Sequence, residues 1–189
     1  LPSNFVEEVV EDNNNKIWIA TSQGLVYKSG AVFVNDGVPE PLKSLSLKSL
    51  DVDTENNLWI ASVENGVYQI DVFGAVKHYN AANGLLSDKI NFVNTDGGKV
   101  FVGTDMGLTI IEGDEIKSLT VQEGLLDNMV TAVHLDGNNQ LWIGSYKGFT
   151  RYDGTQFHYV SDQHPLKQRD VTCIMEDSES NLWISTYRG

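Results

Sequence analysis

One aromatic position recurs along the chain at a nearly constant interval. Four tryptophans and one phenylalanine each stand at the centre of a short apolar run, and they are Trp18, Trp59, Phe101, Trp142 and Trp183. Successive members of this set are separated by 41, 42, 41 and 41 residues. A period in the low forties is typical of repeats that contain four short strands each. The sequence therefore predicts an all-β chain that forms a β-propeller or part of one.

The copy around Trp142 shows the strands of one repeat most clearly. Segments rich in the bulky apolar residues that favour strands cover 130–135, 140–145, 149–152 and 156–160. Short polar turns separate these segments, and Asp153-Gly154 is a strong hairpin sequence. The four segments are predicted to form one antiparallel blade.

The other copies align on this one through a turn aspartate and a glycine. An aspartate lies six residues before the aromatic position in four copies, as Asp12, Asp53, Asp136 and Asp177. The third copy has a turn that is one residue shorter, Asp96-Gly97-Gly98. A glycine lies six residues after the aromatic position, as Gly24, Gly107, Gly148 and Gly189, and Gly66 is displaced by one residue. Glycine is expected where a turn needs a positive φ or a close backbone approach.

This register divides residues 1–189 into about four and a half blades, with about eighteen strands in all. The predicted blades cover about 4–36, 45–79, 89–121 and 128–160, and a half blade covers 170–188. Linkers that contain 41–44, 84–87, 124–127 and 164–167 join them. No third and fourth strands remain to complete the last blade. We therefore expect an open arc that belongs to a larger propeller and associates, through its ends, with further blades or with another copy.

The composition limits the partners of the chain. The 13 Lys and Arg residues against 26 Asp and Glu residues give a net charge of −13, which repels nucleic acids and anionic membranes. The single cysteine, Cys173, excludes an internal disulfide framework. No apolar run reaches the length of a membrane span, and the start at Leu1 shows no signal-peptide pattern. We expect no nucleic acid partner and no direct membrane contact, and we expect that the chain is part of a longer protein.

The repeat resembles a known family. The motif reads Asn57-Leu-Trp-Ile-Ala-Ser62 in the second copy, with close counterparts at 140–145 and 181–186 and variants at 17–21 and 100–104. It is similar to the two-component regulator propeller repeat. That resemblance implies a bacterial sensor region, commonly of seven-bladed propellers, located in the periplasm or elsewhere outside the cytoplasm. In this family such regions precede a membrane span and a histidine kinase or diguanylate cyclase, and some members respond to carbohydrate fragments.

The turns between second and third strands are the predicted recognition site. They differ between copies while their flanks do not, and in a propeller they share one rim with the blade-to-blade linkers. The predicted ligand-binding residues are Gln23, Glu64, Asn65, Asp105, Tyr146, Lys147, Tyr187 and Arg188. Their amide, carboxylate, phenol and cationic groups suit a carbohydrate or another small polar ligand. A rim that is merely solvated is the alternative.

Other candidate sites favour structural roles. The acidic segment 51–56 resembles the start of a calcium loop but lacks its glycine and distal glutamate, so we predict a hairpin turn, no metal and no cofactor. Surface or half-buried roles are expected for the histidines, which are His78, His134, His158 and His164, and a buried structural thiol for Cys173. Ser62, Ser145 and Ser185 lack the motif of a nucleophile. The aromatic residues are expected to pack between blades rather than to stack on sugars.

The repeat and its variable turns are compatible with three functional classes. The first is a sensor segment that binds a ligand or a partner and has no catalysis of its own. The second is a propeller lyase or hydrolase, whose acid and base would have to come from Glu64, Asp105, His134 or Tyr146. The third is a scaffold for protein interactions. An enzyme requires titratable groups within hydrogen-bond reach of one another, whereas a sensor does not.

Overall fold

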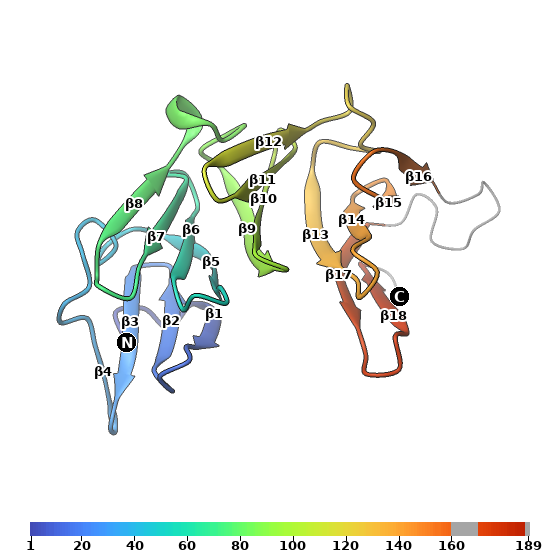
Figure 1. Ribbon diagram of the computed structural model, residues 1–189. Coiled ribbons are helices and arrows are strands. Elements are labelled where there is room, and N and C mark those ends of the chain that lie inside the picture. The colour runs from blue at the N-terminus through green and yellow to red at the C-terminus, as the bar shows by residue number, and fades with distance from the viewer. Residues whose placement is uncertain (160–169, 188–189) are drawn as a thin grey trace.

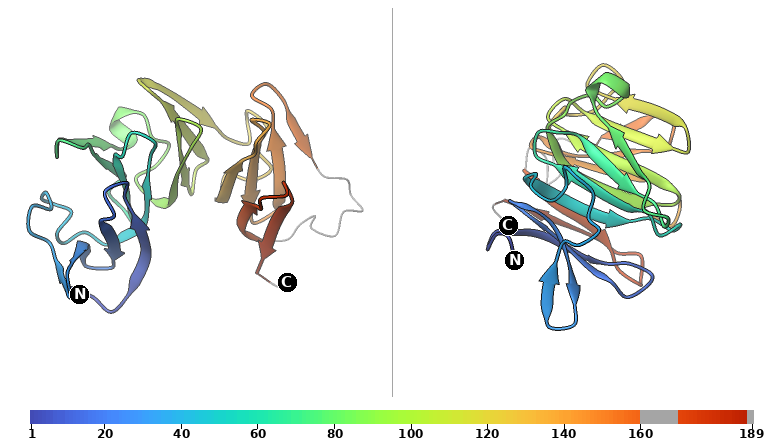
Figure 2. Two further views of the ribbon diagram at one scale, coloured as in Figure 1. Left: turned by 60° about the horizontal axis from the view of Figure 1, so that its bottom comes forward. Right: turned by 90° about the vertical axis from the view of Figure 1, so that its left-hand side faces the viewer.

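The chain folds into an open arc of small antiparallel sheets. The computed structural model describes residues 1–159 and 170–187. Five separate sheets follow one another around a common centre, and a wide gap separates the first sheet from the last (Figure 1, Figure 2). Four sheets have four strands and the last has two, as the repeat predicts. The all-β class, the blades and the open arc are therefore confirmed.

Each sheet is one blade. Blade 1 contains β1 (Val6–Glu11), β2 (Ile17–Thr21), β3 (Gly24–Ser29) and β4 (Val32–Val34). Blade 2 contains β5 (Leu47–Val52), β6 (Leu58–Ser62), β7 (Val67–Ile70) and β8 (Val76–Tyr79). Blade 3 contains β9 (Ile90–Asp96), β10 (Lys99–Thr104), β11 (Leu108–Glu112) and β12 (Glu115–Leu119). Blade 4 contains β13 (Val130–Leu135), β14 (Leu141–Ser145), β15 (Gly148–Tyr152) and β16 (Phe157–Tyr159), and blade 5 contains β17 (Val171–Glu176) and β18 (Leu182–Thr186). The helical content of the described residues is the single 3-10 turn η1 (Ala81–Asn83).

The first strand of each blade is the inner strand of the arc. Inner strands pack on one another along the chain, as β1 does on β5, β5 on β9 and β13 on β17. Each inner strand also carries a bulge at its second residue, because the pairing with the next strand shifts between its first and third residues. A bulge redirects the side chain of the extra residue. Two of these side chains consequently reach the next blade: Asn91 donates to the Val130 carbonyl at 3.0 Å and Thr131 donates to the Val171 carbonyl.

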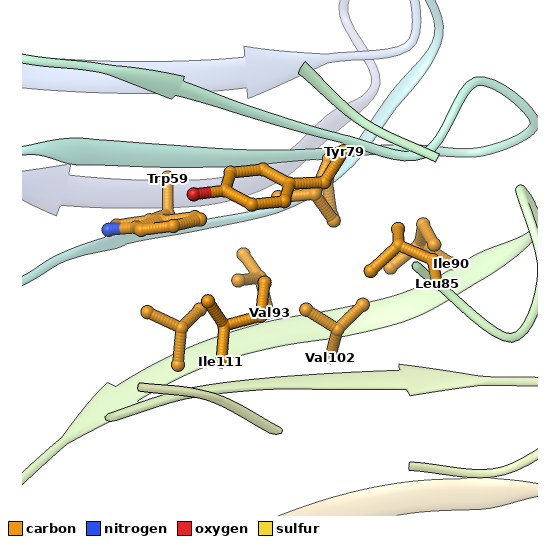
Figure 3. Packing of buried hydrophobic residues seen from close by; sticks show 10 residues of the cluster. Trp59, Tyr79, Leu85, Ile90, Val93, Val102 and Ile111 are labelled. Atoms are coloured by element: carbon orange, nitrogen blue, oxygen red, sulfur yellow. The ribbon is translucent and has the colours of Figure 1, made fainter. Parts of the chain in front are cut away.

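The apolar core consists of layers between neighbouring blades. Figure 3 shows the layer between blades 2 and 3, where Trp59 and Tyr79 of one blade cover Val93, Val102 and Ile111 of the next. Similar layers lie between blades 1 and 2, 3 and 4, and 4 and 5. Linker leucines close two of them, Leu85 and Leu125. Each blade is therefore stabilised mainly by its neighbours.

Burial of the aromatic position depends on the blade that follows it. Trp59 and Phe101, each followed by a complete blade, are 3% and 1% exposed. Trp142 faces the two-stranded blade 5 and is half-buried. Trp183 is 61% exposed, so the prediction that every member of this set is buried between blades is wrong for this residue. Blade 5 is the last of the described blades, so no described blade follows it and covers Trp183.

The turn aspartate fixes the indole of its own blade. In four blades one carboxylate oxygen accepts the tryptophan N–H at 2.8–3.0 Å, and the pairs are Asp12–Trp18, Asp53–Trp59, Asp136–Trp142 and Asp177–Trp183. The other oxygen accepts backbone N–H groups two and four residues further on, which closes the hairpin turn. These bonds, led by that of Trp183, lower the pKa of Asp177 to about 2. The Phe101 side chain has no N–H group, and the turn of its blade is the short Gly97-Gly98 turn.

Candidate functional site

The turns between second and third strands lie at one end of the blades together with the linkers. Backbone hydrogen bonds join the two sets: Gly66 N–H donates to the Asp88 carbonyl at 3.0 Å, and Leu25 N–H donates to the Leu42 carbonyl at 2.8 Å. Tyr187 N–H likewise donates to the Asp170 carbonyl at 2.9 Å. We call this end of the arc, formed by the second-to-third-strand turns and the linkers, the rim.

In blades 1 to 4 a buried hydroxyl holds the rim turn. The last residue of the second strand accepts a backbone N–H from the turn and donates to the carbonyl of the following glycine at 2.8–3.0 Å. The hydroxyl residues are Thr21, Ser62, Thr104 and Ser145. These roles account for Ser62 and Ser145 as turn residues, while the Ser185 hydroxyl pairs with that of Thr172 at 2.8 Å.

A glycine closes each turn because no side chain fits there. Gly66 has a φ of +71°, and a Cβ at this residue would lie 2.2 Å from the Tyr79 carbonyl oxygen. Gly24 has a φ of +118°, and its Cβ would lie 2.2 Å from the Lys43 carbonyl oxygen. The close approach and the positive φ expected from the sequence are both present. Gly189, the corresponding residue of blade 5, lies outside the described residues.

Most of the predicted site residues at the rim are exposed to solvent. Six of them are exposed: Gln23, Glu64, Asn65, Tyr146, Lys147 and Tyr187. Asp105 is half-buried, and its Oδ1 atom is buried without a hydrogen-bond partner. Arg188 lies outside the described residues. The structure thus places seven predicted residues on one surface, distributed over successive blades.

These side chains do not converge on one point. Lys147 pairs with Asp127 of the adjacent linker at 3.5 Å, and the Asn65 carbonyl oxygen lies 2.7 Å from His78 Nε2 of its own blade. Within the described residues, no hydrogen bond or ion pair joins predicted site residues of different blades. The rim is therefore an extended polar surface rather than a compact cluster.

The four residues considered for acid and base catalysis are also separate. Glu64, Asp105 and Tyr146 lie in rim turns of three different blades, whereas His134 lies near the far end of β13. His134 Nε2 is 3.2 Å from the Glu176 carboxylate of blade 5, so this pair joins two inner strands. The structure therefore does not bring these four residues together as an acid and a base.

The acidic segment of blade 2 stabilises its own hairpin turn and the contact with blade 3. Asp53 is the turn aspartate that binds Trp59. Asp51 points to blade 3, where its carboxylate accepts the Thr95 N–H at 2.6 Å and the Thr95 hydroxyl at 3.1 Å. Burial raises the pKa of Asp51, and the Thr95 backbone hydrogen bond opposes that shift. No group of three or more His, Cys, Asp or Glu side chains within residues 1–159 and 170–187 could hold a metal ion.

The remaining histidines and the cysteine occupy the surface. His78 stacks on Tyr68 with ring centroids 4.1 Å apart, and His158 pairs with Asp153 at 2.7 Å. His164 lies outside the described residues. Cys173 is exposed, so the prediction of a buried thiol is wrong. It lies on the face of β17 that, in the other blades, a following blade covers.

A groove at the opposite end of the blades was not predicted from the sequence. It lies between blades 2 and 3, measures about 290 Å³ and has a floor that includes Trp59, Tyr79 and Ile111. Polar side chains form its walls, namely Asp53, Glu55, Asn57, Gln69, Lys77 and Asp114. Gly98 of the short third turn also lines it, and a Cβ at Gly98 would meet nothing within 4 Å. The shortened turn of the third copy is the signal in the sequence that could have indicated this opening.

Comparisons with known proteins agree with the fold. Segments 1–23, 124–147 and 165–188 match the family model described as two component regulator propeller. The extracellular domain of a putative hybrid two component system from B. thetaiotaomicron superposes with a TM-score of 0.80 at 21% identity, covering 96% of this chain and 26% of that domain. The chain thus spans about a quarter of that domain. No curated protein sequence matches the chain significantly.

Two further solved structures show how widely this arrangement of blades is used. A virginiamycin B lyase from Staphylococcus aureus superposes with a TM-score of 0.76 at 11% identity, over 100% of this chain and 66% of the lyase. PorZ, a surface component of the type-IX secretion system of Porphyromonas gingivalis, superposes with a TM-score of 0.70 at 15% identity, over 98% of this chain and 32% of PorZ. At these identities the likeness shows the fold alone.

The described residues contain no helix that is both long and apolar enough to cross a membrane. The segments that the family model matches contain the first two strands of three of the five copies, and the turn aspartate and rim glycine recur in the others. In its repeats, the chain is similar to the two-component regulator propeller family.

Proposed function

We propose that the chain is a segment of the sensor region of a bacterial signal-transduction receptor, located outside the cytoplasm, and that its rim binds a polar ligand such as a carbohydrate. The observation that carries this proposal is that each rim turn combines a recurring backbone frame with side chains that differ from blade to blade. A buried hydroxyl and a glycine hold the same frame in successive blades, while the residues between them differ. A rigid frame with variable side chains is typical of a recognition surface.

Two exposed tyrosines are the principal contacts in this proposal. Tyr146 and Tyr187 are 52% and 76% exposed and lie in the rim turns of blades 4 and 5. A phenol offers an apolar face to a sugar ring and a hydroxyl to its polar edge. Lys147, next to Tyr146, is held at the rim by Asp127 and adds a charged donor. Glu64, Asn65 and Gln23 extend the polar surface to blades 1 and 2.

Calorimetry against a panel of oligosaccharides tests the proposal. Tyr146→Ala is expected to weaken binding by about 5- to 150-fold, because it removes ring contact and one hydrogen bond, together about 1–3 kcal/mol. Lys77→Ala is the matched control, because Lys77 is an exposed residue of the groove at the opposite end. Loss of binding in Lys77→Ala with full binding in Tyr146→Ala would move the site to the groove. A panel without any binder would refute the carbohydrate proposal and favour a role as a scaffold for protein interactions.

A propeller lyase or hydrolase is the second functional class, and only the likeness of fold favours it. An enzyme of this class would turn over the ligand that it binds, which requires an acid and a base at one place. Glu64, Asp105, His134 and Tyr146 lie on different blades or at different ends of a blade. Product analysis of any ligand found in the calorimetric panel distinguishes the two classes: a cleaved ligand would contradict the sensor proposal.

A further inference from the structure

The turns between first and second strands bridge neighbouring blades at the end opposite the rim. The residue after the turn aspartate donates its backbone N–H to an oxygen of the following blade. Asn13 N–H donates to Asn56 Oδ1 of blade 2 at 2.7 Å, and Gly137 N–H donates to the Glu176 carboxylate of blade 5 at 3.3 Å. These two bridges join blade 1 to blade 2 and blade 4 to blade 5.

The groove between blades 2 and 3 lies where the equivalent bridge is missing. Asn56 stands three residues before the aromatic position at a φ of +65°, and its counterpart in blade 3 is Gly98, at a φ of +76°. Gly98 has no side chain that could supply an oxygen. Thr54 N–H, the counterpart of Asn13 N–H, has no acceptor among the described residues. Because Thr54 and Gly98 both line the groove, a ligand there meets a free backbone donor.

An acceptor in the same groove is also unpaired. Asn57 is only 6% exposed, and its Nδ2 donates to Asp53 Oδ2 at 2.9 Å and lies 3.5 Å from Glu55 Oε2. These carboxylates fix the orientation of the amide, because only its NH₂ group can donate to them. Asn57 Oδ1 accepts no hydrogen bond within residues 1–159 and 170–187. Since Asn57 lines the groove, a donor can reach this oxygen from there.

The charges around the groove favour a cationic donor. Three of the four charged side chains that line it are carboxylates, those of Asp53, Glu55 and Asp114. The fourth is Lys77, whose Nζ lies 3.9 Å from the Asp114 carboxylate. An anionic ligand would be repelled by this excess of negative charge, whereas a cation would be attracted.

The arrangement of the acceptors favours a guanidinium over an ammonium. The Glu55 carboxylate stands beside the Asn57 amide, so two acceptors are neighbours. A guanidinium presents several N–H groups in one plane and can bond adjacent acceptors together. The floor of the groove, which includes Trp59, Tyr79 and Ile111, is apolar and suits the aliphatic stem of an arginine side chain (Figure 3).

We propose that this groove binds an arginine residue of a peptide. The guanidinium bonds Asn57 Oδ1 and the Glu55 carboxylate, and a carbonyl oxygen of the peptide accepts the Thr54 N–H. That carbonyl oxygen takes the place that Asn56 Oδ1 occupies between blades 1 and 2. The site lies between two complete blades and at the end opposite the rim, so it does not depend on the carbohydrate proposal.

Calorimetry with N-acetyl-arginine amide tests the ligand class, because this compound carries the guanidinium and amide carbonyls without a carboxylate. N-acetyl-citrulline amide is the matched control, since a neutral urea replaces the guanidinium. The citrulline compound is expected to bind about tenfold more weakly, because it lacks charge-assisted hydrogen bonds. Equal affinity of the two compounds, or binding of neither, would overturn the proposal. Tighter binding of free L-arginine than of the amide would overturn the assignment to a peptide.

Gly98→Asn tests the location of the site. Asparagine tolerates a positive φ, and a Cβ at Gly98 would meet nothing within 4 Å. The new side chain is expected to accept the Thr54 N–H, as Asn56 accepts that of Asn13, and so to abolish binding of N-acetyl-arginine amide without lowering the melting temperature. Gly30→Asn is the matched control, because Gly30 of blade 1 has a φ of +59° and equally open surroundings. Undiminished binding in Gly98→Asn, or an equal loss in both variants, would contradict the proposal.

Glu55→Gln tests the charge without depending on a change at a glycine. Glu55 is exposed, and glutamine keeps the shape of its side chain. The variant is expected to bind the arginine compound more weakly and the citrulline compound as wild type does, so the preference between them falls. A preference for arginine as large as that of wild type would show that Glu55 does not meet the guanidinium and would overturn the proposed contact.

Discussion

At the scale of single residues, the repeat is specified by an aspartate and a tryptophan that act together. The sequence shows both residues at a constant separation, but it shows neither the hydrogen bond between them nor its dependence on the indole N–H. Folding the hairpin places the turn carboxylate beside the indole of the second strand. The third copy is consistent with this pairing, because the tryptophan and the long turn are absent from it together.

Burial, however, decides how much each tryptophan contributes to stability. Trp59→Ala is expected to lower the free energy of unfolding by about 3–5 kcal/mol, since it empties a large buried site. Trp183→Ala is expected to lower it by less than about 1 kcal/mol, since the indole is mostly in solvent already. Urea unfolding of the two variants and wild type measures both values. A loss for Trp183→Ala equal to that for Trp59→Ala would show that Trp183 is covered in solution.

At the scale of elements, the period of the sequence predicted the strands because each strand carries its own apolar pattern. The bulges could not be predicted, since nothing in the pattern distinguishes Asn91 or Thr131 from an ordinary paired residue. The groove between blades 2 and 3 was not predicted either, although the shortened turn of the third copy, which contains Gly98, is a signal of it in the sequence. The exposure of Cys173 and Trp183 depends on the neighbouring blade and not on their own strand.

The rim glycines offer a test at this scale. Gly66→Ala combines a positive φ with a backbone contact at 2.2 Å, while Gly74→Ala at a φ of +84° meets open space. Gly74→Ala is therefore expected to cost about 1–2 kcal/mol of stability through backbone strain alone. Gly66→Ala should cost clearly more, because the Tyr79 strand must also move. Equal losses in thermal or urea unfolding would show that the close approach at Gly66 relaxes freely.

At the scale of the whole molecule, the arc has cores between blades rather than one central core. Stability in such a series is approximately the sum of contributions from each unit and each neighbouring contact. Blades 1 and 5 have one neighbour each among the described blades, and blade 5 has only two strands. The middle of the arc is therefore its most stable part.

Hydrogen exchange should show this gradient directly. The backbone N–H groups of β10 and β6, in second strands with neighbours on both sides, are expected to exchange slowest. Those of β17 and β18 are expected to exchange fastest among the inner and second strands. Exchange followed by mass spectrometry at low protein concentration checks this order. Uniform protection across all five blades would contradict it and indicate a single cooperative unit.

The hydroxyl and glycine that hold each rim turn have an evolutionary consequence. All of their bonds go to backbone atoms, so the frame of the turn does not depend on which side chains stand between the hydroxyl and the glycine. Substitutions there can accumulate without loss of foldability, and each duplicated blade adds a fresh pair of such positions. A lineage built on this unit can thus change what it recognises by point mutation while inheriting its architecture unchanged.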